Sequence, residues 1–227
     1  MDLYSGEFAF PPGEGFRYTS VGYILLQYAL AVQAGAKTWE DYDQMSVLPE
    51  YLRKDMKHTY FINRGRCSAF KKIGMVHTYE SKTVHEWPAT QFSYQDYWEK
   101  TCANGWGFGN IALSARDTAK FWYEYMGTEN IITKEYQELL MHFQPKVHYE
   151  WVQYSYGGGV MWKEYKASAD DPDSDWKKRT MVGHSGVDYG SQAKLTGFNF
   201  DQNVSIALHI NTVEGINCKG SHETDGT

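Results

Sequence analysis

The longest apolar stretch of the chain covers residues 21–34, where only two glutamines interrupt a run of small, aliphatic and aromatic side chains. It is about 14 residues long, whereas a membrane-crossing helix needs about 20. Thr19 or Ser20 can cap its first turn, and Gly35 can adopt the left-handed conformation that often ends a helix. The pattern therefore predicts a helix over residues 21–34. Because apolar side chains cover nearly every side of it, we expect this helix to be buried on all faces.

Two further helices are predicted in the middle of the chain. Residues 113–127, LSARDTAKFWYEYMG, combine an apolar face with Ser114 and Asp117 at the spacing of a capping box. A second helix is expected over residues 133–143, ending before Pro145, because the residue that precedes a proline is pushed out of the helical conformation.

Short segments typical of strands dominate the chain from residue 154 onward, whereas residues 53–100 show no sustained period and are predicted to form loops and short strands. Residues 200–203 have the composition of a tight turn, so the last two strands should pair antiparallel. Helices first and strands last, without βαβ alternation, predict an α+β fold with an antiparallel β-sheet flanked by helices. The predicted strands are YGGGVMWKEY, RTMVGH, SQAKLTGFNF and VSIALHI.

The overall composition excludes several classes of protein. With 227 residues, of which 42% are hydrophobic and 22% charged, the chain suits one globular domain over residues 1–227. The net charge of −6 is modest and the basic residues are scattered, which argues against a nucleic acid partner. The chain shows no transmembrane segment and no secretory signal, so we expect a soluble chain and leave its compartment open.

No metal or other cofactor is predicted. Asp171, Asp173 and Asp175 alternate as in a calcium loop, but the glycine and the glutamate that such a loop needs are missing. The histidines lack the spacing of metal ligands. Three widely separated cysteines offer neither a metal site nor a disulfide framework, and we interpret them as buried thiols: Cys67, Cys102 and Cys218.

Two short polar pieces follow turns and adjoin regular elements, which makes them candidates for chemistry. The first is the Tyr18-Thr19-Ser20 piece at the start of the apolar helix, where the positive end of the helix favours an ionised phenol. The second is His184-Ser185-Gly186 at the end of a predicted strand, where the glycine lets a ligand approach the backbone. Each piece alone is also compatible with ordinary packing.

Five segments, in the same order along the chain, resemble those of the serine β-lactamase and penicillin-binding-protein-like superfamily, in particular its class C, esterase and D-peptidase branch. The resemblance covers most of the chain. The five segments are PPGEGFRYTSVGYILLQYAL, VLPEYLRKDMKHTYF, NGWGFGNIALSARDTAKFWYEYM, YSYGGGVMW and GHSGVDYGSQAKLTGFNFDQNVSIALHIN.

The resemblance implies a serine acyl-transfer site built from a Ser-x-x-Lys nucleophile, a Tyr-x-Asn loop and a Lys-Thr-Gly or His-x-Gly strand. By this resemblance Tyr18 is the general acid or base, and Ser20 stands where the family usually has asparagine. His184, Ser185 and Gly186 fall on the substrate strand, and the N–H of the next residue, Val187, falls on the oxyanion-hole donor. We expect the Tyr18 phenol and the His184 strand edge to face a common crevice.

Two departures from the family pattern bear on the substrate. A serine hydroxyl at position 20 lacks the reach and the simultaneous donor and acceptor of an amide. Histidine at position 184 carries only partial charge near neutral pH, unlike lysine. The expected substrate is therefore a small ester, amide or peptide rather than a carboxylate-bearing β-lactam.

The Ser-x-x-Lys segment is missing at its expected place, since the residues before Tyr18 do not contain it. One literal match, Ser68-Ala69-Phe70-Lys71, lies after the tyrosine motif and is interpreted as a chance occurrence. Without a nucleophile the chain as given is expected to be inactive in acyl transfer. We interpret it as a fragment, the C-terminal portion of a β-lactamase-related serine hydrolase domain with esterase, amidase or D-aminopeptidase-like activity.

A non-catalytic interpretation stays open. Aromatic residues make up 16% of the chain, and an aromatic-lined cleft suits a pseudoenzyme or a carbohydrate- or peptide-binding module as well as core packing. The tryptophans expected near this cleft are Trp106, Trp151, Trp162 and Trp176.

Overall fold

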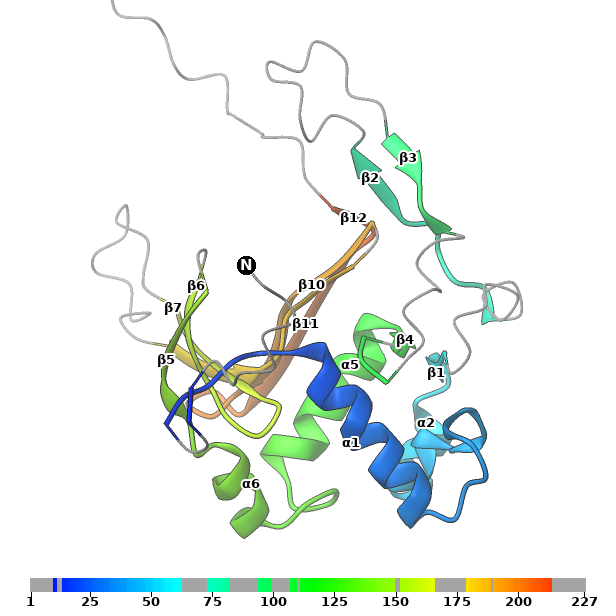
Figure 1. Ribbon diagram of the computed structural model, residues 1–227. Helices are drawn as coiled ribbons and strands as arrows, with labels where there is room; N and C mark the ends of the chain where they lie inside the picture. The colour runs from blue at the N-terminus through cyan, green and yellow to red at the C-terminus, as the bar shows by residue number, and fades with distance from the viewer. Residues whose placement is uncertain are drawn as a thin grey trace, which may run out of the picture.

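The computed structural model describes residues 10–11, 14–62, 73–81, 94–98, 107–109, 111–149, 152–165, 179–188 and 190–213 (Figure 1). Several features named above lie outside these residues: the Ser68–Lys71 match, the three cysteines, the aspartates from Asp171 to Asp175, and Trp106, Trp151 and Trp176.

The predicted first helix is α1, Ser20–Gln33. Of the two capping candidates, Thr19 is the N-cap, and its hydroxyl accepts a hydrogen bond from the Val21 N–H at 3.3 Å. Gly35 follows the helix with φ +74°, the left-handed conformation that glycine adopts without strain. The predicted helix and its end signal are confirmed.

The expectation that α1 is buried on all faces is wrong. Within the described residues its only buried position is Ala31, which packs against Trp39 and Tyr42. Contacts on one side of the helix leave its other side open, and large apolar side chains there are exposed. We call these the α1 stripe: Val21, Leu25, Leu26, Tyr28 and Val32, between 48% and 75% exposed.

The second predicted helix is α5, Ala115–Trp122, which continues into one wider turn over Tyr123–Gly127. The Ser114 hydroxyl accepts a hydrogen bond from the Asp117 N–H at 3.1 Å, as the capping pattern predicts. The fully buried Asp117 carboxylate accepts hydrogen bonds from the His58 N–H at 2.8 Å and the Thr59 hydroxyl at 3.0 Å. Asp117, in the first turn of α5, thus ties the helix to the segment of residues 58–59.

The remaining helical elements are shorter. The third predicted helix is α6, Lys134–Leu140, within the expected range. Before α5 the chain forms η1, Trp39–Asp41; η2, Gln44–Val47; and α2, Glu50–Asp55.

A large antiparallel sheet holds the second half of the chain, with strand order β11-β10-β8-β7-β6-β5 and with β9 paired to β10 beyond the end of β8. Three of the four predicted strands and the antiparallel hairpin of the last two are confirmed. The remaining one, YGGGVMWKEY, is divided: Tyr156 ends one strand, residues 157–160 form a turn, and Met161–Tyr165 form the next strand. The strands are β5 (Gln144–Tyr149), β6 (Val152–Tyr156), β7 (Met161–Tyr165), β8 (Arg179–Gly183), β9 (Gly186–Asp188), β10 (Ser191–Asn199) and β11 (Val204–Ile210).

Strand β5 was not anticipated, because Pro145 was taken only as the end of a helix. β5 lies at one edge of the sheet. A proline, which has no backbone N–H to donate, is tolerated in an edge strand. Two small sheets complete the described fold: β1 (Thr59–Phe61) pairs with β4 (Ile111–Leu113), and β2 (Tyr79–Ser81) lies between β12 (Thr212–Val213) and β3 (Tyr94–Asp96).

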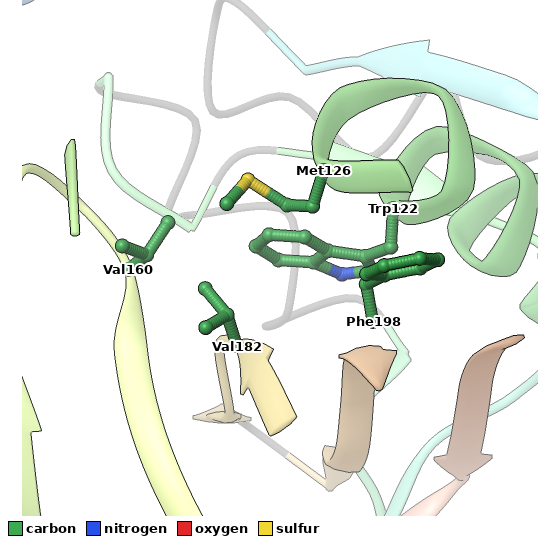
Figure 2. Close-up of a cluster of buried hydrophobic side chains, with 5 residues drawn as sticks. All are labelled: Trp122, Met126, Val160, Val182 and Phe198. Atoms are coloured by element: carbon green, nitrogen blue, oxygen red, sulfur yellow. The ribbon is translucent and has the colours of Figure 1, made fainter. Parts of the chain in front are cut away.

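The main core lies between α5 and the large sheet. Figure 2 shows Trp122 and Met126 from the helical side meeting Val182 and Phe198 from β8 and β10, with Val160 from the turn before β7. Helices α1, α5 and α6 gather on one side of the sheet in Figure 1. This mixed arrangement confirms the predicted α+β fold.

Candidate active site

The candidate site lies at a gap in strand pairing. β8 ends at Gly183 and β9 begins at Gly186, and both pair with β10. In the gap the His184 N–H donates to the Thr196 carbonyl at 3.2 Å, and the Thr196 hydroxyl donates to the His184 carbonyl. His184 and Ser185 therefore leave the regular ladder while their backbone stays attached to β10.

Gly183 allows the backbones of β8 and β10 to lie close together. A Cβ at position 183 would overlap the Thr196 carbonyl and stand 2.6 Å from the Gly197 Cα. Backbone atoms cannot yield as a flexible side chain can, so only glycine fits here.

Gly183→Ala is therefore expected to lower the free energy of unfolding by about 3 kcal/mol, the upper end for overpacking, because β8 must move away from β10. Urea denaturation measures this. The matched control is Gly22→Ala in α1, where an added Cβ meets only an ordinary contact at 3.6 Å, and which should be neutral or stabilising by up to about 1 kcal/mol. Equal effects at the two positions would contradict the steric argument.

Tyr18 and His184, far apart in the sequence, lie in one aromatic cluster. The Tyr18 ring centroid is 6.2 Å from that of His184 and 5.4 Å, edge-on, from that of Tyr156. Phe16 and Tyr23 complete the cluster, at 5.5 Å from Tyr156 and 6.5 Å from Tyr18. The structure thus brings the segment before α1 against the gap between β8 and β9.

A directed chain of hydrogen bonds runs through this cluster. His184 Nδ1 lies 2.6 Å from the Ser185 carbonyl oxygen, which can only accept, so Nδ1 carries the hydrogen. Burial, with a smaller contribution from the Lys163 charge, lowers the pKa of His184, and its imidazole is therefore neutral at pH 7. Nε2 is then an acceptor, so the Tyr156 hydroxyl donates to it at 3.1 Å and accepts from the Tyr23 hydroxyl at 2.8 Å. The partial charge expected for His184 near neutral pH is thus small.

A cation stands next to the gap on the neighbouring strand. Lys163 of β7 donates from Nζ to the Ser185 Oγ at 2.6 Å. Burial lowers the pKa of this ammonium to about 8. The site therefore holds a lysine, although position 184 itself is histidine.

The other candidate residues flank this centre. Ser20 is the first residue of α1 and is half-buried. Gly186 is exposed, and nothing lies within 4 Å of the place where a side chain would stand. Val187 lies opposite Gln192 of β10 with a side chain that is 63% exposed. The chemical roles of these residues stay predictions.

Sequence reasoning missed three members of the site: Tyr23, Tyr156 and Lys163. Tyr23 and Tyr156 appeared only as parts of recognised segments, and nothing local indicates that their hydroxyls meet. The sequence signal for Lys163 was its place in the predicted strand YGGGVMWKEY. Trp162, expected near the cleft, packs against Phe143 with ring centroids 5.6 Å apart and borders the main core.

The described residues lack two kinds of feature. No group of three or more histidine, cysteine or acidic side chains is arranged there to bind a metal ion. None of the helices in that part of the chain combines the length and the apolar character needed to cross a membrane.

Comparison with known proteins gives a family match and several related folds. The family model described as Beta-lactamase matches residues 2–223. No curated protein matches the chain in sequence. The fold is similar to that of two crystal structures, whose names describe hydrolases for D-configured substrates.

One is a D-stereospecific amidohydrolase from Streptomyces sp., with a TM-score of 0.64 and 16% identity over 89% of this chain and 52% of that chain. The other is the D-amino acid amidase from Ochrobactrum anthropi SV3 in complex with L-phenylalanine amide, with a TM-score of 0.64 and 17% identity over 90% of this chain and 52% of that chain. The chain thus spans about half the length of these solved relatives.

Proposed function

Because the chain belongs to the beta-lactamase family, we propose that it carries the tyrosine and substrate-strand part of a serine acyl-transfer site for small esters and amides. The observation that carries this proposal is the contact between Tyr18, before α1, and His184, in the gap between β8 and β9. Two segments that the family pattern assigns to one reaction meet here across a large sequence separation.

In this proposal Tyr18 exchanges a proton with the attacking and leaving groups. The relay from Tyr23 through Tyr156 to His184 supports it, since that relay fixes the orientation of the imidazole next to Tyr18, which burial keeps neutral. Ser20 orients the substrate through its hydroxyl. Ser185 and the open backbone at Gly186 receive the substrate chain, and the Val187 N–H donates to the developing oxyanion.

The serine nucleophile is proposed to come from a segment outside these 227 residues, so that residues 1–227 form one portion of a single domain. The relatives with the same fold are about twice as long as the aligned part, which supports this arrangement. Their names make D-amino acid amides the first substrates to test.

The test uses a longer protein in which the upstream coding sequence precedes residue 1. We expect it to hydrolyse D-phenylalanine amide, and a fluorophosphonate should label a serine of an upstream Ser-x-x-Lys segment. The proposal would be rejected if the fluorophosphonate labelled no upstream serine, or if the labelled protein still hydrolysed the amide. The opposite stereoisomer, L-phenylalanine amide, serves as the control substrate.

A binding module is the second candidate, and the clustering of the half-buried rings of Phe16 and Tyr18 around Tyr156 favours it. Binding of a peptide or sugar by the longer protein without turnover, together with loss of that binding in Phe16→Ala, would support the module over the hydrolase.

A further inference from the structure

We propose that Ser185 and Lys163 form a nucleophilic dyad of this chain's own, in which the Ser185 Oγ accepts the acyl group of an activated ester and Lys163 is the base. This activity goes beyond the proposed function, because it needs no residue outside the chain. The observation behind it is the 2.6 Å contact between Lys163 Nζ and Ser185 Oγ. A base in direct hydrogen-bond contact is what a serine needs to become a nucleophile.

The surroundings of Lys163 suit a base better than a structural cation. Lys163 lies opposite Met181, which is almost fully buried. Among the described residues, Lys163 forms no ion pair with a carboxylate. Near the gap, the titratable side chains whose contacts the structure describes are His184 after β8, Tyr156 on β6, and Tyr18 and Tyr23 from the α1 side, and none of these is a carboxylate.

Burial without a counter-charge has two consequences. It lowers the pKa of Lys163 to about 8, so about a tenth of the side chain is a neutral amine at pH 7, against less than a thousandth for an ordinary lysine. It also costs folding free energy, since a charged amine is held partly away from water and no described side chain offers it an anion. The described contacts of Lys163 therefore suit a base better than a stabilising cation.

The nucleophile is held in place and open to approach. The Ser185 carbonyl accepts a hydrogen bond from the neutral His184 ring. The backbone N–H and the backbone carbonyl of His184 are both hydrogen-bonded to Thr196. The following residue, Gly186, has no side chain, and nothing lies within 4 Å of its missing Cβ. Ser185 itself is half-buried, so a small acyl group can reach its hydroxyl.

The reaction balances without a cofactor. The neutral Nζ takes the Oγ proton while Oγ bonds to the ester carbonyl carbon. The tetrahedral adduct collapses, the bond to the leaving phenol oxygen breaks, and Nζ returns the proton to that oxygen. Water, deprotonated by Nζ, then attacks the Ser185 ester, which releases the carboxylic acid and restores the hydroxyl.

The experiment uses the 227-residue chain itself, with p-nitrophenyl acetate as substrate between pH 6 and pH 9. We expect nitrophenol release above the background rate, rising about ninetyfold over this range and levelling off above pH 8, as the neutral fraction of a lysine with pKa about 8 does. A fluorophosphonate, which loses fluoride when Oγ bonds to phosphorus, should add to the peptide that contains Ser185.

Two variants separate the roles. Ser185→Ala should abolish both labelling and the enzymatic rate. Lys163→Arg keeps the cation but cannot lose its proton near neutral pH, so it should lower the rate at pH 8 at least tenfold and remove the pH step. Ser46→Ala and Lys54→Arg, at exposed positions of η2 and α2, are the matched controls, and circular dichroism checks the fold of each variant.

Three results would overturn the dyad: no label at pH 9, a label on a residue other than Ser185, or a Lys163→Arg rate equal to that of the parent. None of them bears on the proposed function, whose label falls on an upstream serine of the longer protein. Conversely, a labelled Ser185 in the 227-residue chain stands whether or not the longer protein hydrolyses amides.

Discussion

Tyr18→Phe is expected to lower the turnover of D-phenylalanine amide by the longer protein by about two to four orders of magnitude. The substitution removes only the hydroxyl, so the ring contacts with Tyr156 and His184 at 5.4 Å and 6.2 Å remain. The loss should therefore appear in kcat, because the missing proton exchange belongs to the transition state and not to substrate binding.

Steady-state kinetics with kcat and KM determined separately measure this effect. Tyr136→Phe is the matched control, since Tyr136 is an exposed tyrosine of α6 outside the aromatic cluster, and it should retain full turnover. If Tyr18→Phe kept a kcat within threefold of the parent, or changed KM alone, the acid–base role of Tyr18 would be withdrawn.

Trp122→Ala should lower the free energy of unfolding by about 3–5 kcal/mol, the usual cost of replacing a buried tryptophan by alanine. The Trp122 side chain is 7% exposed and joins Met126 on the helical side to Val182 and Phe198 on the sheet (Figure 2). Its removal leaves a cavity between α5 and β8, the strand that ends beside His184.

Urea unfolding followed by circular dichroism measures the loss. Val32→Ala on the exposed side of α1, where the side chain is 75% exposed, provides the control and should change stability by no more than about 0.5 kcal/mol. A Trp122→Ala loss below 1 kcal/mol would mean that this core does not hold the helix to the sheet.

Local rules predicted the elements that local interactions determine. The N-cap and glycine stop of α1, the Ser114 cap of α5 and the hairpin of β10 and β11 each depend on residues a few positions apart, and all are confirmed. The burial of α1 could not be predicted from local signals, because the apolar faces of a helix are buried only if other segments of the chain pack against them. Similarly, Pro145 argues against a helix but does not predict that the segment forms an edge strand, where a proline is tolerated.

The candidate site was predicted in part, for the same reason. The family resemblance named Tyr18 and His184, whose rings the structure then places in contact. It did not name Lys163, because the lysine reaches Ser185 from a different strand, and only sheet pairing determines that approach. The pKa of His184 also depends on burial, which no short segment of the sequence reveals.

The α1 stripe has a practical consequence for anyone who purifies this chain. Val21, Leu25, Tyr28 and Val32 are spaced by four, three and four residues, so they lie along one line of the helix. A continuous row of apolar side chains exposed to water binds chaperones and detergent and promotes association with other copies of the chain. The 227-residue chain should therefore be handled dilute or with a mild amphiphile, and light scattering should be recorded beside every rate.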